Sequence, residues 1–345
     1  MIDLRSDTVT RPTEAMLESM REATLGDDSR DGDATVRELE AMAAERMAKE
    51  AAAYMPSGTM TNLAAVLAHV DRGGEVLLEA GSHILNSELG GITAVAGAFY
   101  RAIPGRRGAM DLDALAEGVR SATRQNFGTA LVCMETTHNR AGGAVLPIDH
   151  MQAVHDLAAQ REVPVHIDGA RVFNAAVALG VEARDIAQYG DSICFCVSKG
   201  LSAPVGSLLC GSGGYIERAR AYRRMLGGNM RQAGPIAAAG IVALATMVNR
   251  LKDDHVTAKR LAGGLHRINS GLVDPAEVET NIVKVNVPVE GRRAADWSAH
   301  LKARGVLVSP CEPYALRFVT HRHIDDAEID EAISAFAALW ESNAS

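Results

Sequence analysis

The chain has 345 residues, of which 47% are hydrophobic and 23% charged, and its formal net charge is −8 at pH 7. This length and composition fit a folded protein of about two domains that buries a large core. The negative charge and the lack of a basic stretch with interleaved aromatic residues argue against nucleic acid or an anionic membrane surface as a partner.

The N-terminus and the cysteines indicate the cellular compartment of the chain. The sequence opens with charged residues instead of an apolar leader, and no stretch of about 18 apolar residues follows, so we expect a cytoplasmic chain without membrane contact. The five cysteines are odd in number and form no C-x-x-C pair. We therefore expect buried free thiols, and neither a metal site nor a disulfide framework.

The first predicted segment is a polar, extended N-terminal arm over residues 1–20, whose last part enters a helix at 13–23. Its many hydrogen-bonding side chains leave two alternatives open, namely an arm that frays in solvent and an arm that contributes to a site. An acidic loop with two glycines follows at residues 26–33 and leads into a predicted amphipathic helix at 35–50.

Small residues then precede an apolar helix that runs to residue 70, and they are Ser57, Gly58 and Thr59. The start of a helix exposes unpaired N–H groups and the positive end of the helix dipole, which suits a phosphate. The three residues are therefore candidates for phosphate binding. An ordinary serine N-cap is the alternative.

Four apolar stretches have the pattern of buried strands, and each is followed by a polar side chain. The strands are predicted at 75–79, 128–134, 163–168 and 193–197, and the polar residues are His83, Glu135, Asp168 and Lys199. Ligands of open α/β sheets bind at the carboxyl ends of the strands, so these four side chains are candidates for one site. Taken singly, each has an ordinary alternative, such as a lysine that reaches solvent.

Asp168 and Lys199 together match the needs of one cofactor. Residues 172–189 between them have a helical pattern, so the two side chains are expected on neighbouring parallel strands. Pyridoxal 5′-phosphate (PLP) needs a lysine for its aldehyde and an acid that keeps its ring nitrogen protonated. The pair therefore predicts a PLP site.

The next part of the chain has a predicted strand at 206–210, a basic helix at 218–225 and a long helix at 235–250. A glycine pair lies next to Arg231 between the two helices, and this pattern suits the approach of backbone to an anion. A surface loop is the alternative.

The pattern changes near residue 251, and a smaller α+β domain is predicted from there to residue 345. Its predicted helices are 256–270, 294–303 and 325–340, and its predicted strands are 282–287, 306–308 and 315–319. Arg317 interrupts the last strand, where a guanidinium suits a carboxylate or phosphate partner. An exposed arginine on an edge strand is the alternative. The large domain is then expected at 21–250, after the arm.

Seven segments in order resemble the threonine aldolases of the β-eliminating lyase group of fold-type I PLP enzymes. The segments are DLRSDTVTRP at 3–12, PSGTMTN at 56–62, ETTHNRAGG at 135–143, HIDGAR at 166–171, SKGLSAPVG at 198–206, MLGGNMRQ at 225–232 and RFVTH at 317–321. The resemblance implies an α/β fold in which a mostly parallel sheet lies between helices and a smaller C-terminal domain follows.

The resemblance also implies roles for residues of the cofactor site. Lys199 would form the Schiff base, Asp168 would pair with the ring nitrogen, and His83 would stack on the ring. Ser57, Gly58 and Thr59 would hold the phosphate. Glu135 belongs to the same predicted site, and Arg231 or Arg224 would come from a partner subunit of a homotetramer built as a dimer of dimers.

For the substrate, the resemblance implies that Ser6, Arg171 and Arg317 hold the carboxylate, with Arg171 also near the ring oxygen. His83 and His138 are both candidates for handling the proton of the β-hydroxyl group.

This chain departs from the family pattern at a few positions. They are Arg30 in place of a tyrosine, Asp31-Gly32 in place of a glycine-acid pair, Ser87 in place of an aromatic residue, Arg224 in place of a lysine and Asn229 in place of a glycine. These positions concern the side-chain pocket or subunit contacts of the family, so they leave the preferred substrate side chain and the threo or allo preference open.

The predicted function is therefore PLP-dependent retro-aldol cleavage of a small β-hydroxy-α-amino acid, of the threonine or allo-threonine type and of L configuration, to glycine and an aldehyde. The protein would be a carbon–carbon lyase. β-Elimination or transamination with the same cofactor is the alternative. A nucleotide-binding dehydrogenase is disfavoured because neither G-x-G-x-x-G nor G-x-x-x-x-G-K-[ST] is present. A catalytically silent PLP regulator is also disfavoured, because the sequence has neither a separate DNA-binding segment nor a basic patch.

Overall fold

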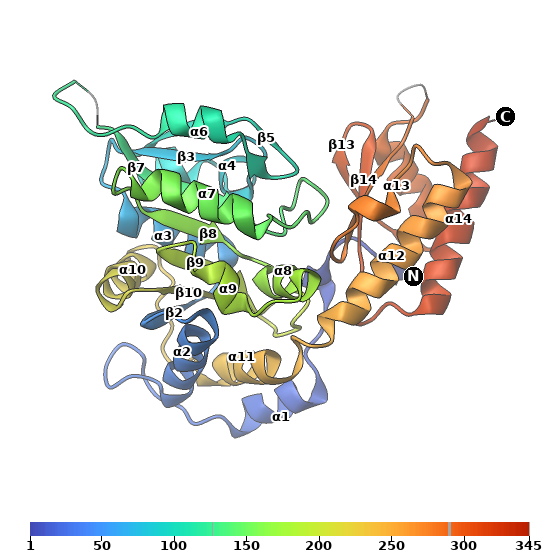
Figure 1. Ribbon diagram of the computed structural model, residues 1–345. Coiled ribbons are helices and arrows are strands. Elements are labelled where there is room, and N and C mark those ends of the chain that lie inside the picture. The colour runs from blue at the N-terminus through green and yellow to red at the C-terminus, as the bar shows by residue number, and fades with distance from the viewer. Residues whose placement is uncertain (126, 289–290, 345) are drawn as a thin grey trace.

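The computed structural model describes residues 1–125, 127–288 and 291–344, and it has a large layered unit followed by a smaller C-terminal unit (Figure 1). The long helix α12, Leu251–Ile268, runs from the first unit into the second. The N-terminus lies beside the C-terminal unit, and the arm runs from there to α1 in the large unit.

The large unit is built on a seven-stranded sheet. In sheet order the strands are β2 (Ala51–Met55), β10 (Ser207–Gly211), β9 (Ser192–Cys196), β8 (Val165–Asp168), β7 (Thr129–Glu135), β3 (Glu75–Glu79) and β4 (Phe99–Ile103). β10 is antiparallel to both of its neighbours, and the other pairs are parallel. The sheet is therefore mostly parallel, as predicted.

Both faces of this sheet are covered, which explains why its central strands read as continuous apolar runs. In β2, Ala52 and Tyr54 pack into the main core with α2 and α11, whereas Ala53 and Met55 pack against α3 and α10 on the other face. The helices of the large unit are α1 (Glu14–Glu22), α2 (Ala34–Met47), α3 (Gly58–His69), α4 (His83–Asn86), α5 (Gly91–Ala94), α6 (Leu112–Gly118), α7 (Ile148–Ala159), α8 (Val172–Leu179), α9 (Ala183–Ala187), α10 (Gly213–Met225) and α11 (Gly234–Thr246).

The C-terminal unit packs helices on one side of a three-stranded antiparallel sheet of order β11-β14-β13. Its elements after α12 are β11 (Ile282–Asn286), α13 (Ala294–Ala303), β12 (Val306–Leu307), β13 (Ser309–Glu312), β14 (Ala315–Val319) and α14 (Asp326–Ala344). Short elements complete the chain: β1 (Ile2–Asp3), β5 (Gly105–Arg106), β6 (Ala109–Met110) and the 3₁₀ helices η1 (Asp7–Val9) and η2 (Pro275–Glu277).

The N-terminal arm belongs to both units. β1 pairs in parallel with β12, and the side chains of Ile2 and Leu4 are part of the C-terminal core. Asp7, a few residues later, is fully buried against the large unit. The predicted domain bounds at 20/21 and 250/251 stay a prediction, because Leu251 at the start of α12 is in the main core and Ala258 is in the C-terminal core.

The single helix predicted over 172–189 is wrong. The structure has two helices, α8 and α9, because Gly180 takes a left-handed conformation with φ of 68° and ends the first of them. The chain then turns and starts again after Glu182. β4 is an edge strand with exposed residues that sequence periodicity did not indicate.

No described helix is by itself long and apolar enough to cross a membrane. α11 and α12 meet the length and composition test only as a pair, and this pair is bent by 71°.

Candidate active site

The carboxyl ends of four adjacent strands of the large sheet surround a cavity of about 390 Å³. β9, β8, β7 and β3 follow one another in the sheet, and the predicted polar residues come at or just after their ends. The cavity is lined by most of the predicted site residues, namely Ser57, Gly58, Thr59, His83, Glu135, Asp168, Arg171 and Lys199. The prediction that these segments form one site is thus consistent with their placement.

Lys199 follows β9 in a tight turn. Its backbone carbonyl accepts hydrogen bonds from the Thr10 hydroxyl at 2.8 Å and from the Ser202 N–H at 2.9 Å, so the N-terminal arm helps to fix this turn. Its side chain lines the cavity, and no hydrogen bond or ion pair joins its amine to another residue in the described part of the chain. The amine is therefore available to a ligand.

Asp168 is the last residue of β8 and only 2% exposed. Its carboxylate accepts hydrogen bonds from the Asn62 amide at 2.9 Å and from the Ala170 N–H at 3.1 Å. Burial alone would raise the pKa of Asp168, but the charges of His83 and Lys199 lower it overall. A buried carboxylate without a direct ion pair among the described residues fits the protonated ring nitrogen of PLP.

The start of α3 also fits the cofactor. Ser57 is the N-cap, and its hydroxyl accepts a hydrogen bond from the Met60 N–H at 3.2 Å, so the ordinary capping role is realised. The N–H groups of Gly58 and Thr59 lie in the first turn, where a helix leaves its donors unpaired. A Cβ atom at Gly58 would lie 3.0 Å from Cys196 Sγ, which makes this a close-fitting backbone cradle for a phosphate.

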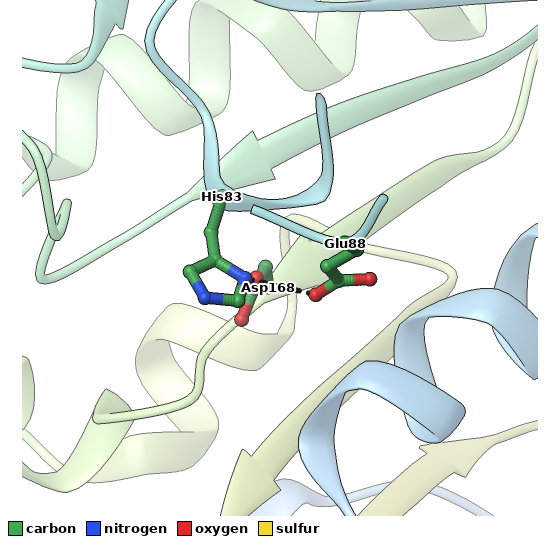
Figure 2. A group of neighbouring side chains, drawn as sticks. All are labelled: His83, Glu88 and Asp168. Atoms are coloured by element: carbon green, nitrogen blue, oxygen red, sulfur yellow. Dashed lines mark hydrogen bonds and ion pairs between the residues drawn. The ribbon is translucent and has the colours of Figure 1, made fainter. Parts of the chain in front are cut away.

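His83 opens the short helix α4 and is held from two sides. Its Nδ1 atom lies 2.9 Å from Glu88 Oε1 (Figure 2), and its backbone N–H donates to Glu135 Oε2. The hydrogen bond to Glu88 raises the pKa of His83, with a further contribution from the charge of Asp168. His83 lines the cavity and is half-buried, as a group that exchanges protons with a ligand needs to be.

His138 does not line the cavity. It is 2% exposed, its Nε2 lies 3.0 Å from Glu79 Oε2, and its Nδ1 accepts a hydrogen bond from the Ala141 N–H at 3.2 Å. Both ring nitrogens are therefore engaged by the protein, and Nε2 also lies 3.9 Å from Oε2 of the cavity-lining Glu135. The structure separates the two candidate histidines and brings only His83 to the cavity.

The two predicted carboxylate-binding arginines differ in their surroundings. Arg171 lines the cavity, but its guanidinium makes a bidentate ion pair with the buried Asp7, with both N–O distances 2.7 Å. Arg317 on β14 donates to the side chain of Asn139 at 2.9 Å, and its buried Nε atom has no partner among the described residues. Arg317 itself does not line the cavity, but its hydrogen-bond partner Asn139 does.

Ser6 and Arg231 lie outside the cavity lining. Ser6 caps η1 and accepts hydrogen bonds from the backbone and hydroxyl of Thr8, which does line the cavity. The side chain of Arg231 is 59% exposed and lies 3.6 Å from Asp27. Arg231 does not contribute to the cavity of its own chain.

The departures from the family pattern are also outside the cavity lining. Arg30 has a side chain 78% exposed beside Asp27, and Ser87 and Arg224 are exposed. Asn229 is hydrogen-bonded to Ser29 and to Arg223. None of these residues lines the cavity, so they leave the cofactor-binding residues unchanged.

Sequence reasoning gave no role to several residues that the structure brings to this site. Asn62 ends the segment at 56–62 that resembles the family, and Glu88 follows the predicted site residue His83 closely, so their nearness to these residues was the only signal in the sequence. Each is buried and hydrogen-bonded to predicted site residues. Their role depends on contacts between separate segments, which sequence spacing does not reveal.

His83, Glu88 and Asp168 also bring one possible metal-ligand atom each to within 4.8 Å of one another (Figure 2). These residue types bind divalent metals, and no metal site was expected from the sequence. Here Glu88 is hydrogen-bonded to His83, and the Asn62 amide donates to both carboxylates. The cluster is thus accounted for by hydrogen bonds between its members and Asn62.

Known proteins resemble this chain along nearly its whole length. A model of the beta-eliminating lyase family matches residues 3–288. A probable low-specificity L-threonine aldolase 2 of Arabidopsis thaliana is 43% identical over 346 residues, which cover 99% of this chain and 98% of the plant protein.

Solved structures share the fold at lower sequence identity. The threonine aldolase of Leishmania major has a TM-score of 0.84 at 17% identity, with 98% of this chain and 99% of that chain covered. A variant of the serine palmitoyltransferase of S. paucimobilis with a bound PLP–myriocin aldimine has a TM-score of 0.76 at 17% identity, with 99% of this chain and 87% of that chain covered.

Proposed function

Because the chain belongs to the beta-eliminating lyase family, we propose that it is a PLP-dependent carbon–carbon lyase that cleaves threonine to glycine and acetaldehyde. Its fold is that of the fold-type I PLP enzymes. The observation that carries the proposal is the pair of neighbouring strand ends, where the free amine of Lys199 and the buried carboxylate of Asp168 line one cavity.

The residues present fit PLP. We propose that Lys199 binds its aldehyde, Asp168 holds the proton on its ring nitrogen, and the first turn of α3 at Ser57, Gly58 and Thr59 binds its phosphate. When bound, PLP supplies a protonated ring that takes up the electron pair left on the substrate when its Cα–Cβ bond breaks.

Other residues in or beside the cavity act on the substrate. His83 lies where it can accept the proton of the β-hydroxyl group, and the hydrogen bond to Glu88, which raises the pKa of His83, makes its imidazole a stronger base for this task. Arg317 has a free buried donor and binds the substrate carboxylate. Arg171 is oriented by Asp7 and contributes positive charge to the same side of the cavity.

Finer features of the enzyme follow from its family resemblance. We propose an L-configured substrate, a cytoplasmic location and a homotetramer with sites shared between subunits. The position of Arg231 supports sharing, because this residue lies outside the cavity of its own chain and is exposed. Ser6 acts on the substrate through Thr8, the residue that it holds at the cavity.

The test is to incubate the purified protein with PLP and L-threonine and to measure the products. We expect glycine and acetaldehyde in equal amounts. Formation of a 2-oxo acid with ammonia would instead identify β-elimination, and transfer of the amino group to an added 2-oxo acid would identify transamination.

Lys199→Ala tests the residue on which the proposal depends. After borohydride reduction, PLP stays attached to the wild-type chain and to the control Lys302→Ala, whose lysine is exposed on α13. We expect no attachment and no turnover for Lys199→Ala. PLP attached at the same stoichiometry to that variant would contradict the assignment.

A further inference from the structure

A buried asparagine connects the two carboxylates beside the cavity. Asn62 is 2% exposed, and its side-chain nitrogen donates to Glu88 at 2.8 Å and to Asp168 at 2.9 Å. The amide has two N–H groups, and these two contacts use both. The orientation of the amide is therefore fixed, because its oxygen would be repelled by two carboxylates in the flipped position.

The oxygen of Asn62 fixes the next donors in turn. It accepts from the Cys194 thiol at 3.1 Å and faces His166 Nε2 at 3.2 Å. His166 must therefore carry its hydrogen on Nε2, so its Nδ1 accepts from the Ser192 hydroxyl at 2.9 Å. Burial lowers the pKa of His166 to about 4, so this ring is neutral at physiological pH, as the arrangement requires.

The chain of donors continues to His69, whose Nε2 lies 2.7 Å from the Ser192 oxygen. Since that hydroxyl donates to His166, it accepts from His69. Every hydrogen bond from His69 to Asn62 then points toward the two carboxylates. A buried row of dipoles with this direction stabilises negative charge at its end. At Glu88 the hydrogen bond from Asn62 thereby offsets part of the effect of burial, which raises the pKa of this carboxyl group.

Glu88 connects the fixed Asn62 amide to His83. The same oxygen, Oε1, accepts from Asn62 and lies 2.9 Å from His83 Nδ1, and Glu88 is only 8% exposed. With Nδ1 engaged, the nitrogen of His83 that remains for a ligand is Nε2. The ionisable groups that face His83 are Glu88 from the loop after α4, Asp168 from β8 and Glu135 from β7.

We propose that Glu88, held by Asn62, is a positioning residue for His83: it keeps the hydrogen of the neutral imidazole on Nδ1 and leaves Nε2 free to accept the proton of the substrate β-hydroxyl. This inference rests on the proposed function, because only the cleavage of a β-hydroxy amino acid requires a base for the β-hydroxyl proton. The geometry of Asn62, Glu88 and His83 is independent of the reaction.

The sign of the effect on titration follows from the charges. A carboxylate beside an imidazole stabilises the protonated ring, so Glu88 raises the pKa of His83, as found here. Replacing Glu88 by an uncharged residue lowers that pKa. The acid limb of the kcat profile, below which the base is protonated, then moves to lower pH.

The deciding experiment titrates His83 by NMR in the full-length protein labelled with ¹³C at histidine, with His83→Asn to assign its signal. In Glu88→Gln, which keeps the shape of the side chain, we expect the pKa of His83 to fall by about 1 unit or more. Glu75→Gln is the matched control, since Glu75 lies on β3 and pairs with Arg101 and Arg120 away from the cavity. The control leaves the titration of His83 unchanged.

Kinetics of the enzyme with its cofactor give the second readout. We expect Glu88→Gln to lower kcat about tenfold to a hundredfold, with KM changed much less and the acid limb at lower pH. Glu88→Asp withdraws the carboxylate by one methylene and also lowers kcat, so it decides the matter if Glu88→Gln does not fold. The proposal would be overturned if His83 titrated in these variants as it does in the wild type and the pH profile of kcat were also unchanged.

The two proposals fail in different ways. If the wild-type protein does not release glycine from threonine, the proposed function is wrong, and the NMR titration still decides whether Glu88 sets the state of His83. If cleavage occurs but His83 titrates alike with and without the Glu88 carboxylate, only the positioning role is wrong.

Discussion

Asp7 shows how a single residue of the N-terminal arm determines the state of the active site. It is 0% exposed and makes a bidentate ion pair with Arg171, while Asn281 of the C-terminal unit donates to the same carboxylate at 3.2 Å. An arginine buried in this way needs its counter-charge, because an uncompensated buried charge is strongly destabilising. Asp7 thus keeps Arg171 charged and oriented beside the cavity.

The pH dependence of stability should reveal this pair. Burial alone would raise the pKa of Asp7, but Arg171 lowers it from 3.8 to about 2. A carboxylate with a lowered pKa stabilises the fold above its ordinary value, and this stabilisation is lost as the pH falls from about 4 to 2. The linked contribution is about 2 kcal/mol.

We therefore expect Asp7→Asn to lower the free energy of unfolding by about 3–5 kcal/mol at pH 7, and by clearly less near pH 3. Thermal unfolding of both proteins at a series of pH values measures the difference. Asp113→Asn, an exposed position at the start of α6, serves as the control. A difference that is constant from pH 7 to 3 would argue against an ionised Asp7.

Arg317 leads to a prediction about substrate binding. Its Nε is buried without a partner in the described structure. Burial, and next the charge of Arg171, lower the pKa of Arg317. A substrate carboxylate would supply the missing partner and would therefore be bound strongly. We expect Arg317→Lys to raise KM for threonine at least about tenfold, because lysine cannot reproduce a bidentate contact. Steady-state kinetics measure this.

The matching control is Arg304→Lys, since Arg304 is exposed and its guanidinium donates to the backbone carbonyl of His300 in α13. It should leave KM unchanged. Equal KM values for Arg317→Lys and the wild type would remove Arg317 from the substrate site.

At the scale of elements, sequence pattern succeeded where burial is uniform. β9 and β8 are buried at every residue, so their apolar runs identified them, and their polar ends identified Asp168 and Lys199. β4 has mostly exposed residues and lies at the sheet edge, so no period marked it. Glu88 and Asp7 gain their roles from contacts with distant segments, and no local pattern of charge distinguishes such residues from exposed acids.

The turn into β10 tests how tightly one element is fixed. Gly206 has φ of 115°, and a Cβ atom there would lie 2.3 Å from the ring of Tyr54. That ring is buried, and its hydroxyl donates to the Val205 carbonyl at 2.9 Å, so it has no free space to move into. We expect Gly206→Ala to destabilise the protein by about 3 kcal/mol or more.

Gly214 is the matched control within the next helix. A Cβ atom there would meet nothing within 4 Å. Gly214→Ala should therefore be neutral or stabilising by up to about 1 kcal/mol. Thermal unfolding of the two variants side by side gives the comparison. Similar midpoints for both would show that the Tyr54 ring moves aside at little cost.

At the scale of the whole molecule, the arm and α12 join two cores. Leu4 is 0% exposed in the C-terminal core, where its N–H donates to Leu307 at 2.9 Å and its carbonyl accepts from Val319 at 2.8 Å. Three residues further on, the arm is tied to the large unit by Asp7. The active site lies where these ties meet, since Arg317 comes from the smaller unit and Lys199 from the larger one.

Both tryptophans are in the C-terminal unit, which allows its unfolding to be followed separately. Trp297 is fully buried there and stacks on Phe336, and Trp340 packs against the same core. Tryptophan emission thus reports on the C-terminal core, whereas far-UV circular dichroism is dominated by the more numerous helices of the large unit.

Leu4→Ala leaves a cavity in the C-terminal core alone, at a cost of about 2–5 kcal/mol. If the domain boundary lies near residue 250, the emission transition should move to lower temperature than the dichroism transition, while Leu25→Ala, at a side chain 64% exposed, moves neither. An equal shift of both transitions would mean that the arm and α12 join the two cores into one cooperative unit. If the emission transition comes first, loss of threonine cleavage should follow it, because unfolding of the smaller core removes Arg317 from its place beside the cavity-lining Asn139.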